Sequence, residues 1–132
     1  MRYLLDTNIL SDVIKNPQGQ ATNRITTLNS NDLFTSIIVA AEMRYGIEKK
    51  SSPILTARVD SLLQTLTILP LDIGVDRHYG QIRMHLERQG NMIGANDLLI
   101  AAHALSLDAI LVTHNVREFE RVNGLKTEDW LS

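Results

Sequence analysis

Short apolar runs alternate with longer helical segments along this chain, and the alternation limits the possible folds more than any other feature. Five runs have the character of strands, the last of them the weakest: residues 2–5, 33–36, 67–69, 109–113 and 126–130. Strands that alternate with helices are typical of α/β proteins with a parallel sheet. We therefore expect an α/β fold with a central, mostly parallel sheet of four to five strands.

Seven helices are expected between and after these strands, over residues 8–15, 21–30, 37–50, 53–66, 75–89, 95–105 and 116–120. Their ends carry ordinary helix signals: Ser36 is a candidate N-cap, Pro53 suits a first helical turn, and Gly90 suits a helix end. The helix that begins at Ala95 is apolar on nearly every face, so we expect it to be buried.

Length and composition restrict the kind of protein. The 132 residues suffice for one domain, residues 1–132, without disulfides, and the chain has no cysteine. No apolar run approaches the roughly 20 residues that cross a bilayer, and Asp6 interrupts the short apolar run at the N-terminus. We expect no membrane association and a cytoplasmic location. The net charge of −2 argues against coating nucleic acid by bulk charge, so such a contact needs a local basic patch.

Four oxygen-bearing side chains stand where sites form in parallel α/β proteins. Asp6 and Asn115 each follow an expected strand, and the carboxyl ends of parallel strands meet at one edge of the sheet. Asp97 opens the buried helix, where a charge needs a partner or a metal. Glu42 shares an apolar helix face with Ile38, one turn away, so its charge also needs compensation.

Each of these residues also has an ordinary structural explanation. Asp6 and Asn115 are residue types that cap helices, and a helix is expected directly after each. Asp97 is favoured by the positive end of its helix dipole. Glu42 can pair with a neighbouring arginine. Taken singly, none of the four identifies a site.

Taken as a set, the four residues have the chemistry of a magnesium site. Carboxylate and amide oxygens without a His or Cys partner suit Mg²⁺ or Mn²⁺ rather than Zn²⁺. Clustered carboxylates without a cation would repel one another and raise one another's pKa. A divalent ion at such a site neutralises a phosphodiester and lowers the pKa of a bound water. The four histidines show no metal-ligand spacing, and P-loop and serine-hydrolase motifs do not occur.

The same residues lie in segments that resemble a known family. Residues 5–10 (LDTNIL), Glu42 with Tyr45-Gly46, residues 96–102 (NDLLIAA) and residues 111–115 (LVTHN) resemble, in this order, the four motifs of PIN-domain nucleases. Within that group the chain resembles the VapC toxins of bacterial type II toxin–antitoxin pairs. Three further segments resemble the signatures of the enterobacterial-type branch: residues 80–83, 117–122 and 128–130. The resemblance covers essentially the whole chain.

The resemblance implies a three-layer α/β/α sandwich. It implies a metal-dependent endoribonuclease that cleaves structured RNA, often tRNA, that arrests growth, and that a VapB-type antitoxin inhibits. It also implies a homodimer, and exposed apolar residues expected on the helices of residues 37–66 would suit such an interface. Mg²⁺ is the expected cofactor, with Mn²⁺ as a substitute.

Roles for individual residues follow from the same resemblance. Asp6, Glu42 and Asp97 become metal ligands, and Asp6 or Asp97 helps to generate the attacking hydroxide. The metal ligands are oriented by hydrogen bonds from three further residues: Thr7, Asn8 and Thr113.

The chain departs from the family at the fourth acidic position, which carries Asn115. An amide ligand lowers the charge of the site and makes a tightly held second metal less favourable. Glu118, one helical turn onward, is the alternative ligand, but in so short a helix we expect it to face solvent. Among the basic residues, Arg83 and Arg117 are the expected RNA contacts.

Two other functions fit a small α/β domain with acidic residues. A phosphoryl-receiver module usually has paired acids after the first strand and a lysine near the last one. Here Thr7-Asn8 follows Asp6, and no lysine directly follows the strand of residues 109–113. A catalytically inactive PIN scaffold would bind RNA or protein without cutting it, and the acidic residues at Asp6, Glu42 and Asp97 argue against this.

Overall fold

The computed structural model describes residues 1–131 and has the expected α/β architecture. One sheet contains five strands: β1 (Tyr3–Leu5), β2 (Leu33–Ser36), β3 (Thr67–Leu69), β4 (Ile110–Val112) and β5 (Thr127–Glu128). The strand order is β3-β2-β1-β4-β5, and every neighbouring pair runs parallel. The sheet in this part of the chain is thus parallel throughout.

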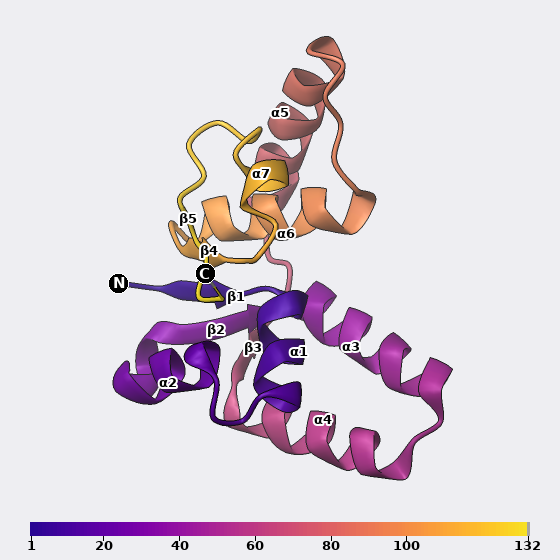
Figure 1. The fold of residues 1–132 in the computed structure, drawn as a ribbon. Helices are drawn as coiled ribbons and strands as arrows, with labels where there is room; N and C mark the ends of the chain where they lie inside the picture. Colours follow the sequence, from indigo (N-terminus) through magenta and orange to yellow (C-terminus); the bar gives the residue numbers. More distant parts are fainter. Residues whose placement is uncertain (132) are drawn as a thin grey trace.

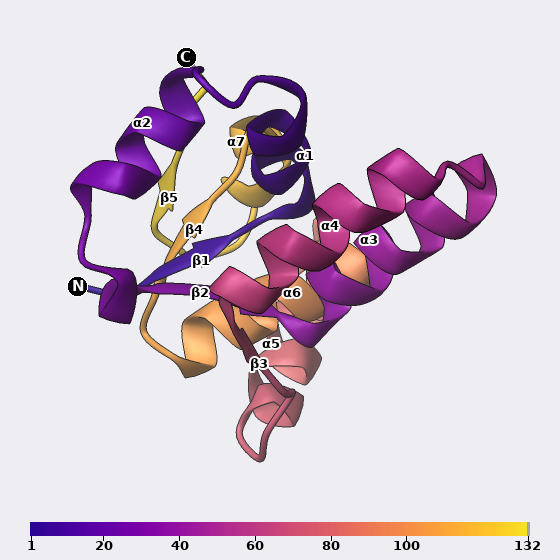
Figure 2. The same ribbon diagram turned by 90° about the horizontal axis from the view of Figure 1, so that it is seen from below.

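Within residues 1–131, seven α-helices cover the two faces of the sheet: α1 (Thr7–Lys15), α2 (Gln20–Thr27), α3 (Ile37–Lys50), α4 (Pro53–Thr65), α5 (Val75–Arg88), α6 (Ala95–Ser106) and α7 (Val116–Phe119). Helices α1 to α4 lie on one side of the sheet and α5 to α7 on the other, which makes the three-layer sandwich (Figure 1). Seen from below, α3 and α4 form a hairpin that projects beyond the sheet (Figure 2). No helix within residues 1–131 is long and apolar enough to cross a membrane.

Most helix boundaries agree with the sequence signals. The Ser36 hydroxyl accepts the backbone N–H of Ile38 at 3.1 Å and so caps α3. Pro53 occupies the first turn of α4, where its missing N–H costs no hydrogen bond. The long apolar helix, α6, is buried over most of its length, as expected.

One predicted helix is too long. Helix α2 ends at Thr27 rather than at residue 30, and a separate 3-10 turn follows at Ser30–Asp32. The Asn29 side chain accepts the backbone N–H of Asn31 at 2.9 Å and so caps the new turn. Asn competes with helical hydrogen bonding in this way, which explains the break.

The strand order determines where a site can form. The chain runs from β1 outward to β2 and β3, and then crosses to β4 on the other side of β1. In open α/β sheets, ligands bind beyond the carboxyl ends of the strands at such a change of direction. Leu5 is in register with Val112, so Asp6 and Thr113 leave the sheet side by side.

The core lies on both faces of the central strands. Leu4, Leu5, Leu111 and Phe119 have no exposed surface. Buried polar side chains accompany them, and none of their buried nitrogen or oxygen atoms in the described residues lacks a hydrogen-bond partner. This full pairing allows polar residues to stand at the end of the sheet, because an unpaired buried group would be costly.

Candidate active site

Asp6 lies at the junction of β1 and α1, and its carboxylate is held from two sides. Its exposed fraction is only 4%. One oxygen, Oδ1, accepts the backbone N–H of Thr7 at 2.8 Å, and the other, Oδ2, accepts the Thr113 hydroxyl at 2.8 Å. Burial raises the pKa of Asp6, and the two hydrogen bonds oppose the rise. Asp6 is therefore both the N-cap of α1 and a fixed carboxylate at the sheet edge.

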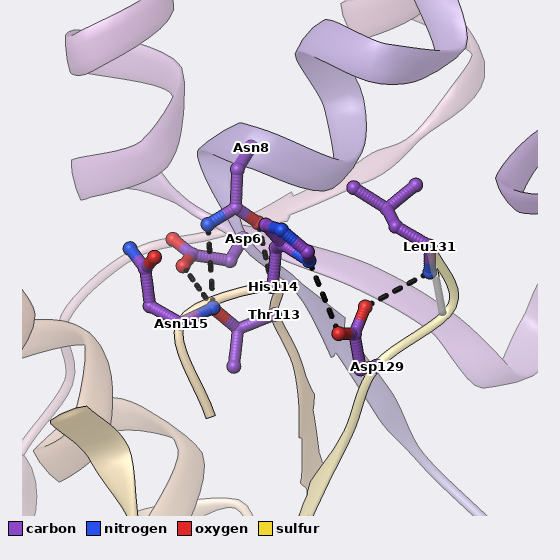
Figure 3. A network of polar contacts seen from close by, with 7 residues as sticks. All are labelled: Asp6, Asn8, Thr113, His114, Asn115, Asp129 and Leu131. Atoms are coloured by element: carbon purple, nitrogen blue, oxygen red, sulfur yellow. Dashed lines mark hydrogen bonds and ion pairs between the residues drawn. The ribbon is translucent and has the colours of Figure 1, made fainter. Parts of the chain in front are cut away.

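The direction of the Thr113 hydroxyl is determined by its other contacts. Its oxygen accepts the backbone N–H of Asn115 at 3.0 Å and the side-chain amide of Asn8 at 3.4 Å. Both lone pairs are thus occupied, and the single hydroxyl hydrogen is directed to Asp6 (Figure 3). Asn8 is held in turn, because its Oδ1 accepts the backbone N–H of His114 at 3.0 Å. Asn8 and Thr113 therefore join Thr7, the third residue predicted to orient the ligands, in one network with Asp6.

Glu42 reaches the same end of the sheet from α3. Its Oε1 accepts the Thr7 hydroxyl at 2.6 Å, so Thr7 donates its N–H to Asp6 and its O–H to Glu42. The ordinary explanation for Glu42, an ion pair with an arginine, is not supported. Arg44 of the same helix pairs with Asp60 instead. Within residues 1–131, Glu42 forms no ion pair with a lysine or arginine.

Asp97 stands in the first turn of α6 and faces a second carboxylate, Glu118 of α7. Burial, together with a hydrogen bond with Glu118 and the charges around it, raises the pKa of Asp97 to about 7. The charges that contribute to this rise are the negative charges of Glu118, Asp6 and Glu42. These three residues and Asp97 therefore act on one another electrostatically, and we call them the carboxylate cluster.

The expectation that Glu118 faces solvent is wrong. The Glu118 side chain is half-buried, and its Oε1 accepts the backbone N–H of Gly94 at 3.2 Å, just before α6. The neighbouring Phe119 has no exposed surface, and this anchor turns α7 so that Glu118 points toward the start of α6. No local pattern in the sequence indicates this orientation, because it depends on the burial of Phe119.

Asn115, the predicted fourth ligand, has a weaker connection to the site. It occupies the N-cap position of α7, but its side chain makes no capping hydrogen bond. The side chain is exposed, and its amide has no hydrogen bond to any residue in 1–131. Only the backbone N–H of Asn115 enters the network, through Thr113. In the structure the Glu118 side chain, and not that of Asn115, contacts Asp97.

The two predicted RNA contacts differ in their surroundings. Arg83 is engaged along its own helix: its guanidinium donates to Glu87 at 3.0 Å and to the Tyr79 hydroxyl at 2.9 Å. Arg117 is exposed and lines an open hollow of about 560 Å³ together with Glu118. Arg117 is therefore next to the carboxylate cluster, whereas Arg83 contacts none of its members.

The donor set of the carboxylate cluster fits a hard divalent cation. It offers only oxygen atoms, and no lysine or arginine among the described residues neutralises them by an ion pair. No three of the acidic or histidine side chains in residues 1–131 stand close enough to form a ready-made cage. Mg²⁺ does not require one, because it keeps several waters and binds through one or two carboxylates together with substrate phosphate.

Comparisons with known proteins agree with this geometry. The model of the PIN domain family matches residues 3–125. Ribonuclease VapC2 of Haemophilus influenzae is 42% identical over 132 residues, which cover 99% of each chain. The tRNA(fMet)-specific endonuclease VapC of Shigella flexneri is 40% identical over 131 residues and 98% of each chain.

A solved structure shows the same fold. The crystal structure of DNA-bound VapBC from Salmonella typhimurium contains a chain that superposes with a TM-score of 0.92, at 37% identity and with 98% of both chains covered. The fold of this chain is thus shared with a solved relative over nearly its whole length. The chain belongs to the PIN-domain family and, within it, to the VapC ribonucleases.

Proposed function

We propose that this chain is the toxin of a VapBC-type pair and acts as a Mg²⁺-dependent endoribonuclease on structured RNA, with tRNA as the substrate. The observation that carries the proposal is the convergence of Asp6, Glu42, Asp97 and Glu118 at the switch point of the sheet. The names of the relatives support the reaction and the kind of substrate. Hydrolysis of RNA by such a toxin would arrest growth, and its substrate would be met in the cytoplasm.

The residues of the chain prepare the site in a defined way. When bound, Mg²⁺ would neutralise the phosphodiester and help to activate water. Asp6, Glu42, Asp97 and Glu118 would hold the ion directly or through water. Thr7 fixes the spacing of two of these carboxylates, because one residue donates to both Asp6 and Glu42. Such orienting hydrogen bonds typically contribute 10- to 100-fold in metal affinity or activity.

Two protein partners belong to the proposal. The solved relative from Salmonella typhimurium is a VapBC complex, and this supports a VapB-type antitoxin as the inhibitor. A second copy of the chain would form a homodimer through α3 and α4. On these helices Ile37, Tyr45 and Ile54 are 44%, 65% and 68% exposed, which is unusual for large apolar side chains at a solvated surface.

The alternative functions have less support. A phosphoryl-receiver module needs an accessible aspartate after its first strand, whereas Asp6 is buried and bonded at both oxygens. The family match to the PIN domain also excludes the receiver family. In an inactive PIN scaffold, four neighbouring carboxylates without a pairing lysine or arginine would only repel one another. The cleavage assay below distinguishes such a scaffold from a nuclease.

The test of the proposed function is cleavage of a purified tRNA pool. In Mg²⁺, the chain is expected to convert one or a few tRNAs into two fragments each, which sequencing of the new ends would locate. Duplex DNA of similar length is the control and should stay intact. Binding of tRNA without any new ends, in Mg²⁺ and in Mn²⁺, would instead identify an inactive scaffold.

A matched pair of variants tests the assignment of the fourth acidic position. Glu118→Gln keeps the size of the side chain but removes its charge, and we expect kcat/KM for RNA to fall by about 10- to 100-fold, as for other supporting groups of metal sites. Asn115→Ala should change it by about twofold at most, since an exposed and unbonded side chain is lost. The opposite order of effects would restore Asn115 as the ligand.

A further inference from the structure

His114 is the residue of the site whose function the carboxylate cluster does not explain. It lies in the turn between β4 and α7, and its backbone N–H is bound by Asn8 Oδ1 at 3.0 Å. Its ring nitrogen Nδ1 contacts Asp129 Oδ2 at 3.1 Å (Figure 3). Asp129 is only 18% exposed, whereas the His114 side chain is 56% exposed. A surface imidazole is thus fixed at both its backbone and its ring.

The contact with Asp129 determines what the other ring nitrogen can do. A carboxylate accepts hydrogen bonds, so Nδ1 carries the hydrogen in either protonation state. In the neutral ring Nε2 is then an acceptor, and in the charged ring it is a donor. Within residues 1–131 no group hydrogen-bonds to Nε2. One polar atom of fixed orientation is therefore left for a ligand.

The surroundings of His114 indicate the kind of ligand. His114 lines the same open hollow of about 560 Å³ as Arg117, Glu118, Arg121 and Asp129. Glu118 belongs to the carboxylate cluster, so the hollow begins where the cleaved phosphodiester would lie. Arg117 forms no ion pair with any described residue, so its charge is available to a phosphate. The hollow thus suits the sugar–phosphate backbone of a nucleotide next to the cleaved bond.

We propose that His114, positioned by Asp129, contacts the ribose 2′-hydroxyl of this adjoining nucleotide and makes the site selective for RNA over DNA. This proposal rests on the proposed ribonuclease function and identifies the residue that would distinguish RNA from DNA in that reaction. A 2′-hydroxyl both donates and accepts hydrogen bonds, so it matches Nε2 in either protonation state. A phosphate oxygen only accepts, and it would require the charged ring. The 2′-hydroxyl is also the group that distinguishes RNA from DNA.

The test is a scan of RNA oligonucleotides, each with one 2′-deoxynucleotide, around the cleaved bond of the tRNA fragment. With the unchanged protein, deoxy substitution at one position beside the cleaved bond should raise KM by about five- to tenfold, the size of one lost hydrogen bond. The value of kcat should stay within about twofold. His114→Ala should raise KM on all-RNA by the same factor and lose the effect of deoxy substitution at that position. His114→Gln keeps a polar group at this position, so part of the effect of deoxy substitution should return.

His78→Ala, the same change on α5, is the matched control and should leave the deoxy profile unchanged. The backbone hydrogen bond from His114 to Asn8 does not involve the imidazole and is kept in His114→Ala. A His114→Ala protein that cuts RNA with the original deoxy profile would overturn the inference but not the proposed function. If His114→Ala instead cuts all the oligonucleotides more weakly by the same factor, the inference is also overturned, and His114 is assigned to a phosphate contact. RNA left uncut by the unchanged protein would overturn both.

Discussion

An Asp97→Asn variant is expected to lose RNA cleavage by about 1000-fold or more and to remain folded. Burial and the acidic neighbours of Asp97 raise the pKa of its carboxyl group to about 7. Metal-ion catalysis contributes several kcal/mol, and each 1.36 kcal/mol of lost stabilisation is tenfold in rate. Single-turnover cleavage of the tRNA substrate measures the effect, and Asp6→Asn should behave alike.

Asp108→Asn is the matched control for this loss. It makes the same chemical change at an exposed position just before β4, at the opposite end of the sheet. Asp108 has a positive φ of 51°, a conformation that Asn also adopts readily. We expect wild-type cleavage from this variant. Wild-type cleavage from Asp97→Asn in Mg²⁺ would remove Asp97 from the site.

The stability of the Asp97→Asn variant tests the raised pKa of Asp97 independently of RNA cleavage. The pKa of Asp97 is about 7 in the folded protein against an ordinary value of 3.8, so the folded state keeps a proton that the unfolded chain has released. Without metal, this group therefore lowers the free energy of unfolding as pH rises from about 4 to about 7. The Asn variant lacks this slope. Above pH 7 it should be the more stable protein, as measured by urea unfolding.

Removal of divalent metal is the second change with a large expected effect. In EDTA, cleavage of RNA should stop completely, and Mn²⁺ or Mg²⁺ in excess should restore it, because clustered carboxylates need a cation to bind a phosphodiester. The same ion should stabilise the fold. At about 100 times its Kd, linkage gives about 2.7 kcal/mol, or roughly 10 °C in the melting temperature for a domain of this size.

The thermal shift separates metal binding from catalysis. It requires no substrate, and it should shrink in Asp97→Asn and in Glu118→Gln but not in Asp108→Asn. Full cleavage in EDTA would refute the metal mechanism. A melting temperature that no divalent cation changes would show that the carboxylate cluster holds no ion in the free protein.

The sequence predicts the fold well because its strand and helix signals are local and consistent. The runs of residues 33–36 and 67–69 are strands with those same bounds, and the caps at Ser36 and Pro53 begin helices as expected. The break after Thr27 was missed because it depends on one side chain, Asn29, that competes with the helix. A pattern of apolar residues does not report such competition.

The site was harder to predict because its residues come from distant segments. Asp6, Glu42 and Asp97 could be selected one by one from strand ends and apolar faces. Glu118 could not, because its direction depends on how deeply Phe119 enters the core. The pairing of His114 with Asp129 depends in the same way on β5 lying next to β4. Burial and strand order decide these contacts, and neither is visible in a single segment.

The hydrogen bond between Asp6 and Thr113 joins residues that are 107 positions apart. The ribosome must therefore synthesise most of the chain before Asp6 can bond to Thr113 as well as to Thr7, and it must reach residue 118 before the fourth carboxylate exists. Contacts of such long range form only after the intervening chain has been ordered. A chain that ends before Thr113 consequently cannot form this hydrogen bond or the carboxylate cluster.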